Sequence, residues 1–128
     1  AQIAEVSPWA FADAVCERNA PRAMEMLNLM KAPSLVFLHS VLVGRLRELI
    51  CAKSLDARGA ASGLARELGR QSWQVKNHVR WSRAFGEEEL VELLGQAAVC
   101  ERALKGSQDS EAAFARFVLA MASPNAAR

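Results

Sequence analysis

Five leucines recur every three or four residues in the first half of this 128-residue chain: Leu35, Leu38, Leu42, Leu46 and Leu49. This spacing places all five on one face of an α-helix. Pro33 and Ser34 stand directly before the first of them, and serine is a favoured N-cap residue. The segment therefore predicts a helix over about residues 34–53, with a broad apolar face that other elements must cover.

The rest of the chain favours helices as well. It holds 24 Ala and 15 Leu, but no Thr or Tyr and only 12 Val or Ile. Ala and Leu lead the scale of helix propensity, whereas strands favour β-branched and aromatic residues. The sequence therefore predicts an all-α fold, a single compact bundle of about six to seven helices that forms one domain over residues 1–128.

The other helices are predicted from N-cap residues, apolar residues at helical spacing and glycine stops. They span about residues 8–18, 20–30, 61–68, 73–84, 87–105 and 110–121. Trp9, Phe11 and Val15 are the apolar positions expected in the first of these helices. Three glutamates, 87–89, begin the sixth helix of the chain, where the helix dipole favours negative charge.

The net charge of +2 is unevenly distributed. Residues 57–86 hold six basic side chains and one acidic side chain, whereas residues 87–128 hold four basic and seven acidic side chains. Lys and Arg gathered on one segment are typical of a phosphate-binding surface. A solvated surface that lies against the acidic last third of the same chain explains the same charges, so both interpretations stay open.

The basic segment also resembles a helix–turn–helix motif over residues 60–84. Residues 61–69 would form the first helix and its turn, and residues 73–84 would form the recognition helix. Its polar side chains suit base edges in the major groove: Lys76, Asn77, Arg80 and Arg83. The Ala-x-x-Leu-Gly turn is shared with helical pairs that never touch DNA. A DNA-binding transcriptional regulator is therefore the alternative function for this chain.

The sequence predicts no catalytic, cofactor-binding or metal-binding site. Its glycines are too sparse for a phosphate loop, and Cys16, Cys51 and Cys100 have no second Cys or His at metal-ligand spacing. An odd number of scattered cysteines is typical of a reduced, cytoplasmic protein. His39 is expected in the core or an interface, and His78 has no partner at useful spacing. No run of 18 apolar residues occurs, so no membrane helix is predicted.

Four segments recur in an order typical of one known family. They are residues 11–27, the Leu- and Arg-bearing segment 38–53, residues 64–85, and the turn 101–106. Together they resemble the C-terminal collar domain of the bacterial DNA polymerase III delta subunit, a part of the clamp loader. The last segment departs from the Asp-x-x-x-Lys-x-Gly pattern of the family, because Glu101 replaces Asp and Gly106 comes one place early.

The resemblance implies a non-catalytic oligomerisation domain that holds the sliding-clamp loader together during DNA replication. The implied partners are the gamma/tau and delta-prime subunits. The chain would then be the C-terminal fragment of a larger subunit, whose preceding part binds the sliding clamp. Its Ala-rich helices would pack on neighbouring subunits or inside its own core, with Ala10, Ala14, Ala97, Ala98, Ala112 and Ala113 as examples.

The resemblance also implies a position near primer–template DNA, where an aromatic residue can stack on an unpaired base. Trp73 stands at the matching place, between Arg70 and Lys76. The expected DNA contacts are Arg70, Trp73, Lys76, Arg80 and Arg83. The alternative is a half-buried Trp73 at the start of a helix, because tryptophan is highly buried on average.

Overall fold

The computed structural model describes residues 6–106 and 109–124, and within these ranges it contains seven α-helices and no strand. The helices are α1 (Pro8–Cys16), α2 (Ala20–Leu29), α3 (Leu35–Ala57), α4 (Leu64–Leu68), α5 (His78–Ser82), α6 (Glu87–Lys105) and α7 (Ser110–Ala122). Two short 3-10 helices precede α4 and α5: η1 (Ala61–Gly63) and η2 (Ser72–Val75). The all-α prediction is confirmed. The chain ends assigned to the single domain, residues 1–5 and 125–128, lie outside the described residues.

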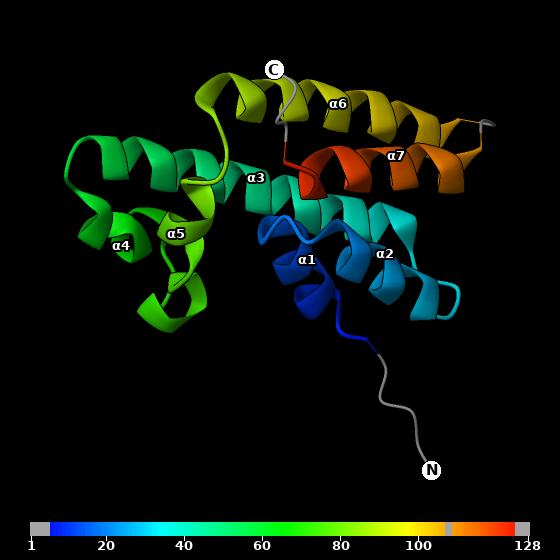
Figure 1. The fold of residues 1–128 in the computed structure, drawn as a ribbon, viewed down its shortest axis with the longest axis horizontal. Coiled ribbons are helices and arrows are strands. Elements are labelled where there is room, and N and C mark those ends of the chain that lie inside the picture. Colours follow the sequence, from blue (N-terminus) through cyan, green and yellow to red (C-terminus); the bar gives the residue numbers. More distant parts are fainter. Residues whose placement is uncertain (1–5, 107–108, 125–128) are drawn as a thin grey trace, which may run out of the picture.

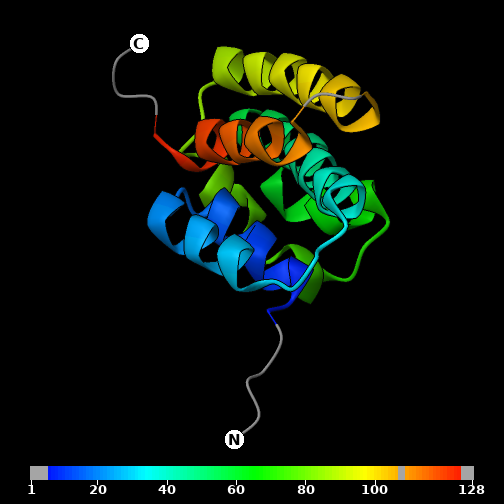
Figure 2. The same ribbon diagram turned by 90° about the vertical axis from the view of Figure 1, so that its right-hand side faces the viewer.

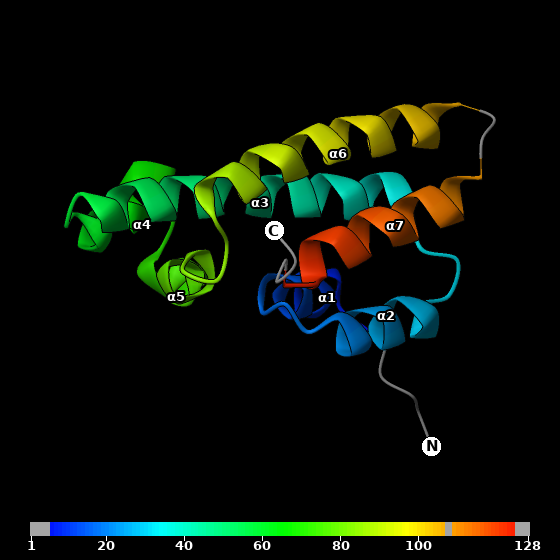
Figure 3. The ribbon, with the colours of Figure 1, turned by 45° about the horizontal axis from the view of Figure 1, so that its top comes forward.

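The long leucine-bearing helix, α3, is the centre of the bundle (Figure 1). It contacts α6 and α7 on one side, α1 on another, and α4 and α5 near its C-terminal end. Seen end-on, α1 and α2 lie below α7 while α6 lies above it (Figure 2). In Figure 3, α6 runs alongside α3 for most of its length. The helix α3 extends four residues beyond the predicted end at Lys53, and Leu55 in this extension is buried.

Local sequence signals set where the helices begin. Side chains of the N-cap residues accept hydrogen bonds from backbone N–H groups of the first turn: Ser7 from Trp9 at 3.0 Å, Asn19 from Arg22 at 3.2 Å, Ser34 from Phe37 at 3.2 Å, and Asp109 from Ala112 at 3.1 Å. Each bond satisfies a donor that the helix itself leaves unpaired. Gly69 ends α4 with φ of 65°, a left-handed conformation that glycine adopts without strain.

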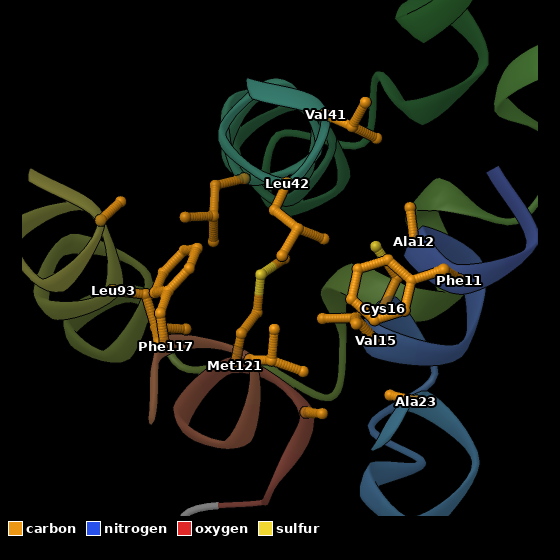
Figure 4. Close-up of a cluster of buried hydrophobic side chains, with 14 of the residues drawn as sticks. Phe11, Ala12, Val15, Cys16, Ala23, Val41, Leu42, Leu93, Phe117 and Met121 are labelled. Carbon is orange, nitrogen blue, oxygen red and sulfur yellow. The ribbon is translucent and has the colours of Figure 1, made fainter. Parts of the chain in front are cut away.

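The main core lies between α3, α6, α7 and α1 (Figure 4). At its centre, Leu42 of α3 and Met121 of α7 point toward one another, and Phe117 lies beside Leu93 of α6. All four side chains are at most 2% exposed. Burying a side chain of this size stabilises a fold by about 1.5–3 kcal/mol, so this layer is the principal source of stability.

A second, smaller core holds the basic segment in place. Ala52 and Leu55 of α3 pack with Leu64 of α4 and Val75 of η2, and all four side chains are buried. This cluster fixes α4 and η2 against the C-terminal end of α3, at the left of Figure 1. The residues between these two elements are thereby presented at the surface.

Residues 73–84 do not form the single recognition helix that the sequence predicted. They are divided into η2, a turn and the five-residue α5. The side chain of Gln74 folds back and accepts a hydrogen bond from the backbone N–H of Gln71 at 2.9 Å, which stabilises the 3-10 turn. Residues 76–77 then form a turn, with Asn77 at φ of −105°, before α5 begins at His78. The prediction of a helix–turn–helix recognition helix was therefore wrong.

None of the helices in the described ranges combines the length and the apolar character that a bilayer-spanning segment requires.

Candidate nucleic-acid interface

Three of the five predicted DNA contacts line one hollow in the surface. Arg70, which follows α4, Trp73 in η2 and Lys76 after η2 all border it. The hollow has a volume of about 490 Å³, and we call it the first hollow. The other two predicted contacts, Arg80 in α5 and Arg83 after α5, do not border it. The basic segment therefore presents its charges in two separate places.

Trp73 is exposed, with 69% of its surface accessible. This excludes the half-buried position that the sequence left open as an alternative. An exposed tryptophan of this kind loses contact with water when a planar group stacks on it, so it is suited to binding rather than to packing.

Trp9 of α1, one of the apolar positions expected in the first helix, borders the first hollow as well. It is 57% exposed, whereas Phe11 and Val15 are fully buried. The helical period explains the difference, because two residues along a helix correspond to a turn of about 200°. Trp9 therefore points away from the face that Phe11 buries. The sequence named Trp9, Phe11 and Val15 together as apolar positions, and the helical spacing separates the exposed Trp9 from the other two.

Polar groups from three helices line the first hollow and differ in burial. Arg45 of α3 pairs with Asp13 of α1 at 2.8 Å and lies over the ring of Trp81 at 5.4 Å. Within the described residues, two buried ring nitrogens have no hydrogen-bond partner here: Nε1 of Trp81 and Nδ1 of His78. An unpaired buried polar atom of this kind costs about 1–3 kcal/mol, and both nitrogens lie beneath the surface of the hollow.

Glu48 of α3 links two residues of this site. Its carboxylate accepts a hydrogen bond from Nε2 of His78 at 2.8 Å and pairs with Nη2 of Arg70 at 2.9 Å. Burial raises the pKa of Glu48, but the His78 hydrogen bond and the Arg70 charge outweigh it and leave the pKa below its ordinary value. The carboxylate is thus ionised at neutral pH and holds Arg70 at the rim. Thirty positions separate Glu48 from His78, so no sequence spacing indicated this pair.

Arg83 is held on the other side of the basic segment. Its Nε and Nη2 donate to the two carboxylate oxygens of Asp56 at 2.9 and 3.0 Å. The hydrogen bond and the charge of Arg83 lower the pKa of Asp56. Arg80 is exposed, and no acidic side chain in the described part of the chain pairs with it. Part of the local positive charge is therefore balanced within the chain.

His39 and Cys16 are buried in the core of the bundle. His39 is buried and its Nε2 hydrogen-bonds to the carbonyl oxygen of Ala97 at 2.8 Å, as expected for a core residue. Burial raises the pKa of the Cys16 thiol to about 12, although the nearby Arg45 lowers it, so this thiol is not a nucleophile at neutral pH. No three His, Cys, Asp or Glu side chains gather into a metal-binding group within residues 6–106 and 109–124.

Comparison with known proteins identifies one family. The family model described as "DNA polymerase III delta subunit, C-terminal domain" matches residues 7–121. No curated protein and no solved structure matches the chain. The matched range contains every helix described above almost completely and includes the whole of the first hollow.

Proposed function

The chain belongs to the family formed by the C-terminal domains of DNA polymerase III delta subunits, and from this premise we propose that it acts as a non-catalytic collar domain of the clamp loader. In this role it binds the gamma/tau and delta-prime subunits through helix packing and holds the loader together. The proposal needs a surface on which a neighbouring helix can pack closely.

The middle of the outer face of α6 is exposed and apolar. We define this face as Val91, Gly95, Ala98 and Val99, which stand at positions i, i+4, i+7 and i+8 of the helix. Val91 is 67% exposed and Val99 is 58% exposed, while the opposite side of α6 packs on the core through Leu90, Leu93, Ala97 and Cys100. A helix with apolar residues on both sides is suited to lie between its own core and a partner.

Small residues at the middle of this face favour close packing. A Cβ atom added to Gly95 would meet nothing within 4 Å, so the face is open there. Ala98 lies one turn further along and is exposed. Helices that meet over Gly and Ala can bring their backbones close together and exclude water between them.

The proposal is tested by placing a charge in the middle of this face. In the delta subunit that carries this chain, Ala98→Arg should weaken association with delta-prime and gamma/tau by about tenfold or more, because an unpaired charge would be buried in the interface. Analytical ultracentrifugation of the mixed subunits measures this. Leu29→Arg is the matched control, since Leu29 is 61% exposed on α2, away from α6. Full assembly with Ala98→Arg would contradict the collar function.

We further propose that the same domain contacts DNA at the first hollow through Arg70, Trp73 and Lys76. The exposed indole of Trp73 between two cationic side chains supports this part of the proposal, because stacking combined with backbone charge is the usual means of binding unpaired strands. The short α5, with His78 and Trp81 buried, does not offer the base-reading face of a helix–turn–helix regulator. Trp73→Ala should weaken binding of a primer–template junction, measured by fluorescence anisotropy.

A further inference from the structure

Another hollow lies between α2 and α7, at the end of the bundle where the chain turns from α2 into α3 and where α7 begins (Figure 1). It has a volume of about 670 Å³, and we call it the second hollow. It shares no residue with the first hollow or with the outer face of α6, and α2 lies on the opposite side of α7 from α6 (Figure 2). The proposed function therefore does not use this surface.

The second hollow is lined mainly by apolar side chains. It is bordered by four that are partly buried and pack against the main core: Met24 and Leu27 of α2, Met30 at the end of α2, and Leu35 of α3. Phe114 of α7 borders it too and is fully buried. Methionine is flexible and polarizable, so it adapts to the shape of a partner. The second hollow is thus suited to receive apolar side chains from outside.

Two acidic side chains give the second hollow a negative rim. Asp109 and Glu111, at the start of α7, border it and are exposed. Within residues 6–106 and 109–124, neither of them forms an ion pair, and no Lys, Arg or His borders the hollow. The chain as a whole carries a net charge of +2, so the negative charge is local to this rim. It repels the phosphates of a nucleic-acid strand and attracts a basic side chain.

We propose that the second hollow binds a short amphipathic helix of a partner protein, with apolar side chains on one face and lysine or arginine beside them. Two helices that contact each other, α2 and α7, form its walls, and a groove of this kind accepts apolar side chains that recur at three- and four-residue steps of a third helix. The partner's apolar side chains pack on Met24, Leu27 and Leu35, and its basic side chains pair with Asp109 and Glu111. This docking is independent of the collar packing on α6 and of the DNA contact at the first hollow.

The test measures binding of a fluorescein-labelled synthetic helix of about 15 residues to the 128-residue chain by fluorescence anisotropy. The peptide carries leucine at three- and four-residue steps, lysine beside the leucines and alanine elsewhere. A second peptide with glutamate in place of lysine should bind about tenfold more weakly or worse, because its charges meet the acidic rim. Ala115→Phe should weaken binding of the lysine peptide by about tenfold, since Ala115 borders the hollow and the larger ring fills it. Circular dichroism confirms that each variant is folded.

The acidic rim is tested by a double variant that keeps the start of α7 intact. Asp109→Asn with Glu111→Gln removes both charges, and asparagine can still cap α7 as the aspartate does, whose Oδ1 accepts a hydrogen bond from the backbone N–H of Ala112 at 3.1 Å. We expect binding of the lysine peptide to weaken by about threefold or more. The matched control, Glu87→Gln with Glu88→Gln, removes two exposed charges from the start of α6, outside the hollow, and should leave affinity unchanged.

Equal binding of the two peptides would overturn the inference, because charge would then play no part in docking. An equal loss of affinity in the rim variant and in its control would overturn it too, since the peptide would then respond to net charge alone. So would unchanged affinity in Ala115→Phe, or no binding at peptide concentrations up to about 1 mM, where weak docking is still detected. These results are separate from subunit assembly, which Ala98→Arg tests, and from the DNA contact, which Trp73→Ala tests.

Discussion

Arg18 and Glu89 form a two-pronged ion pair that joins the end of α1 to the first turn of α6. Nη1 of Arg18 donates to Oε1 at 2.9 Å, and Nη2 donates to Oε2 at 2.6 Å. The same guanidinium donates to the carbonyl oxygens of Ala84 and Ser123 and lies over the ring of Phe85 at 4.2 Å. One side chain therefore connects α1, the turn before α6 and the end of α7.

Removing this guanidinium should destabilise the fold strongly. Arg18 and Glu89 side chains are 3% and 11% exposed, so Arg18→Ala leaves a nearly buried carboxylate without its cation. Breaking a buried pair from one side costs about 3–5 kcal/mol, which is a large part of the stability of a small domain. Urea unfolding followed by circular dichroism measures this loss. Exposed surface pairs contribute about 1 kcal/mol or less. A loss of stability in that range would show that Arg18 does not hold the three elements together.

The backbone conformation of Arg18 predicts a difference in stability between the glycine and the alanine variants. Its φ is 61°, in the left-handed region that side-chain-bearing residues rarely adopt. Arg18→Gly loses the same ion pair as Arg18→Ala, but glycine adopts this φ without a Cβ penalty. We therefore expect Arg18→Gly to be about 1 kcal/mol less destabilised than Arg18→Ala. Equal stabilities would show that the backbone relaxes in the alanine variant.

The lowered pKa of Glu48 predicts how the free energy of unfolding changes at acid pH. Its pKa is below the ordinary value of about 4.3, mainly because the His78 hydrogen bond and the Arg70 charge outweigh the effect of burial. The ionised carboxylate therefore contributes stability that is fully present above about pH 4.3 and is lost as the pH falls through the lowered pKa. Glu48→Gln should flatten this part of the curve of unfolding free energy against pH. An unchanged curve would show that other carboxylates dominate acid unfolding.

The three thiols should react at different rates. Burial raises the pKa of Cys16 to about 12, and burial is also the main cause of the raised pKa of Cys100. Cys51 is only partly buried. In native protein at pH 8, a disulfide reagent should modify Cys51 first and Cys16 only as fast as the fold opens. Peptide mass spectrometry during labelling identifies the order, and early modification of Cys16 would contradict its buried position.

Local signals made most of the helices predictable from the sequence. Ser34 and Asp109 cap their helices through hydrogen bonds to residues three positions later, and Gly69 ends α4 through its own backbone freedom. Such signals act within one turn, so neighbouring letters of the sequence reveal them. The leucine spacing of α3 is equally local. The sequence did not predict the last turn of α3, because the burial of Leu55 depends on packing against α4 and η2.

The segment 73–84 and most of the site depend on contacts that no local pattern contains. His78 turns inward to meet Glu48, thirty positions away, and Trp81 lies under Arg45. These contacts compete with a continuous helix and replace it by a 3-10 turn and a short α5. Trp73, Arg70 and Lys76 were predicted from the resemblance, but their closeness to Trp9 arises only when α1 packs against α3.

The separation of Lys76 from Arg83 leads to a prediction about salt. Lys76 is exposed beside the first hollow, and no acidic side chain in the described ranges forms an ion pair with it. Arg83 is exposed too, but its Nε and Nη2 already donate hydrogen bonds to the carboxylate of Asp56. A cation that contacts a phosphate of a single strand adds about 0.7 to the slope of log affinity against log salt concentration.

Lys76→Ala should therefore reduce the slope for oligothymidine binding by about 0.7, because one phosphate contact is lost. Arg83→Ala should leave the slope nearly unchanged, since Asp56 already neutralises that side chain outside the hollow. The two variants remove the same formal charge from the same segment. A difference between their slopes therefore depends on where the side chain lies and not on the net charge. Equal reductions would show that the strand follows the whole basic segment and would contradict a DNA contact confined to the first hollow.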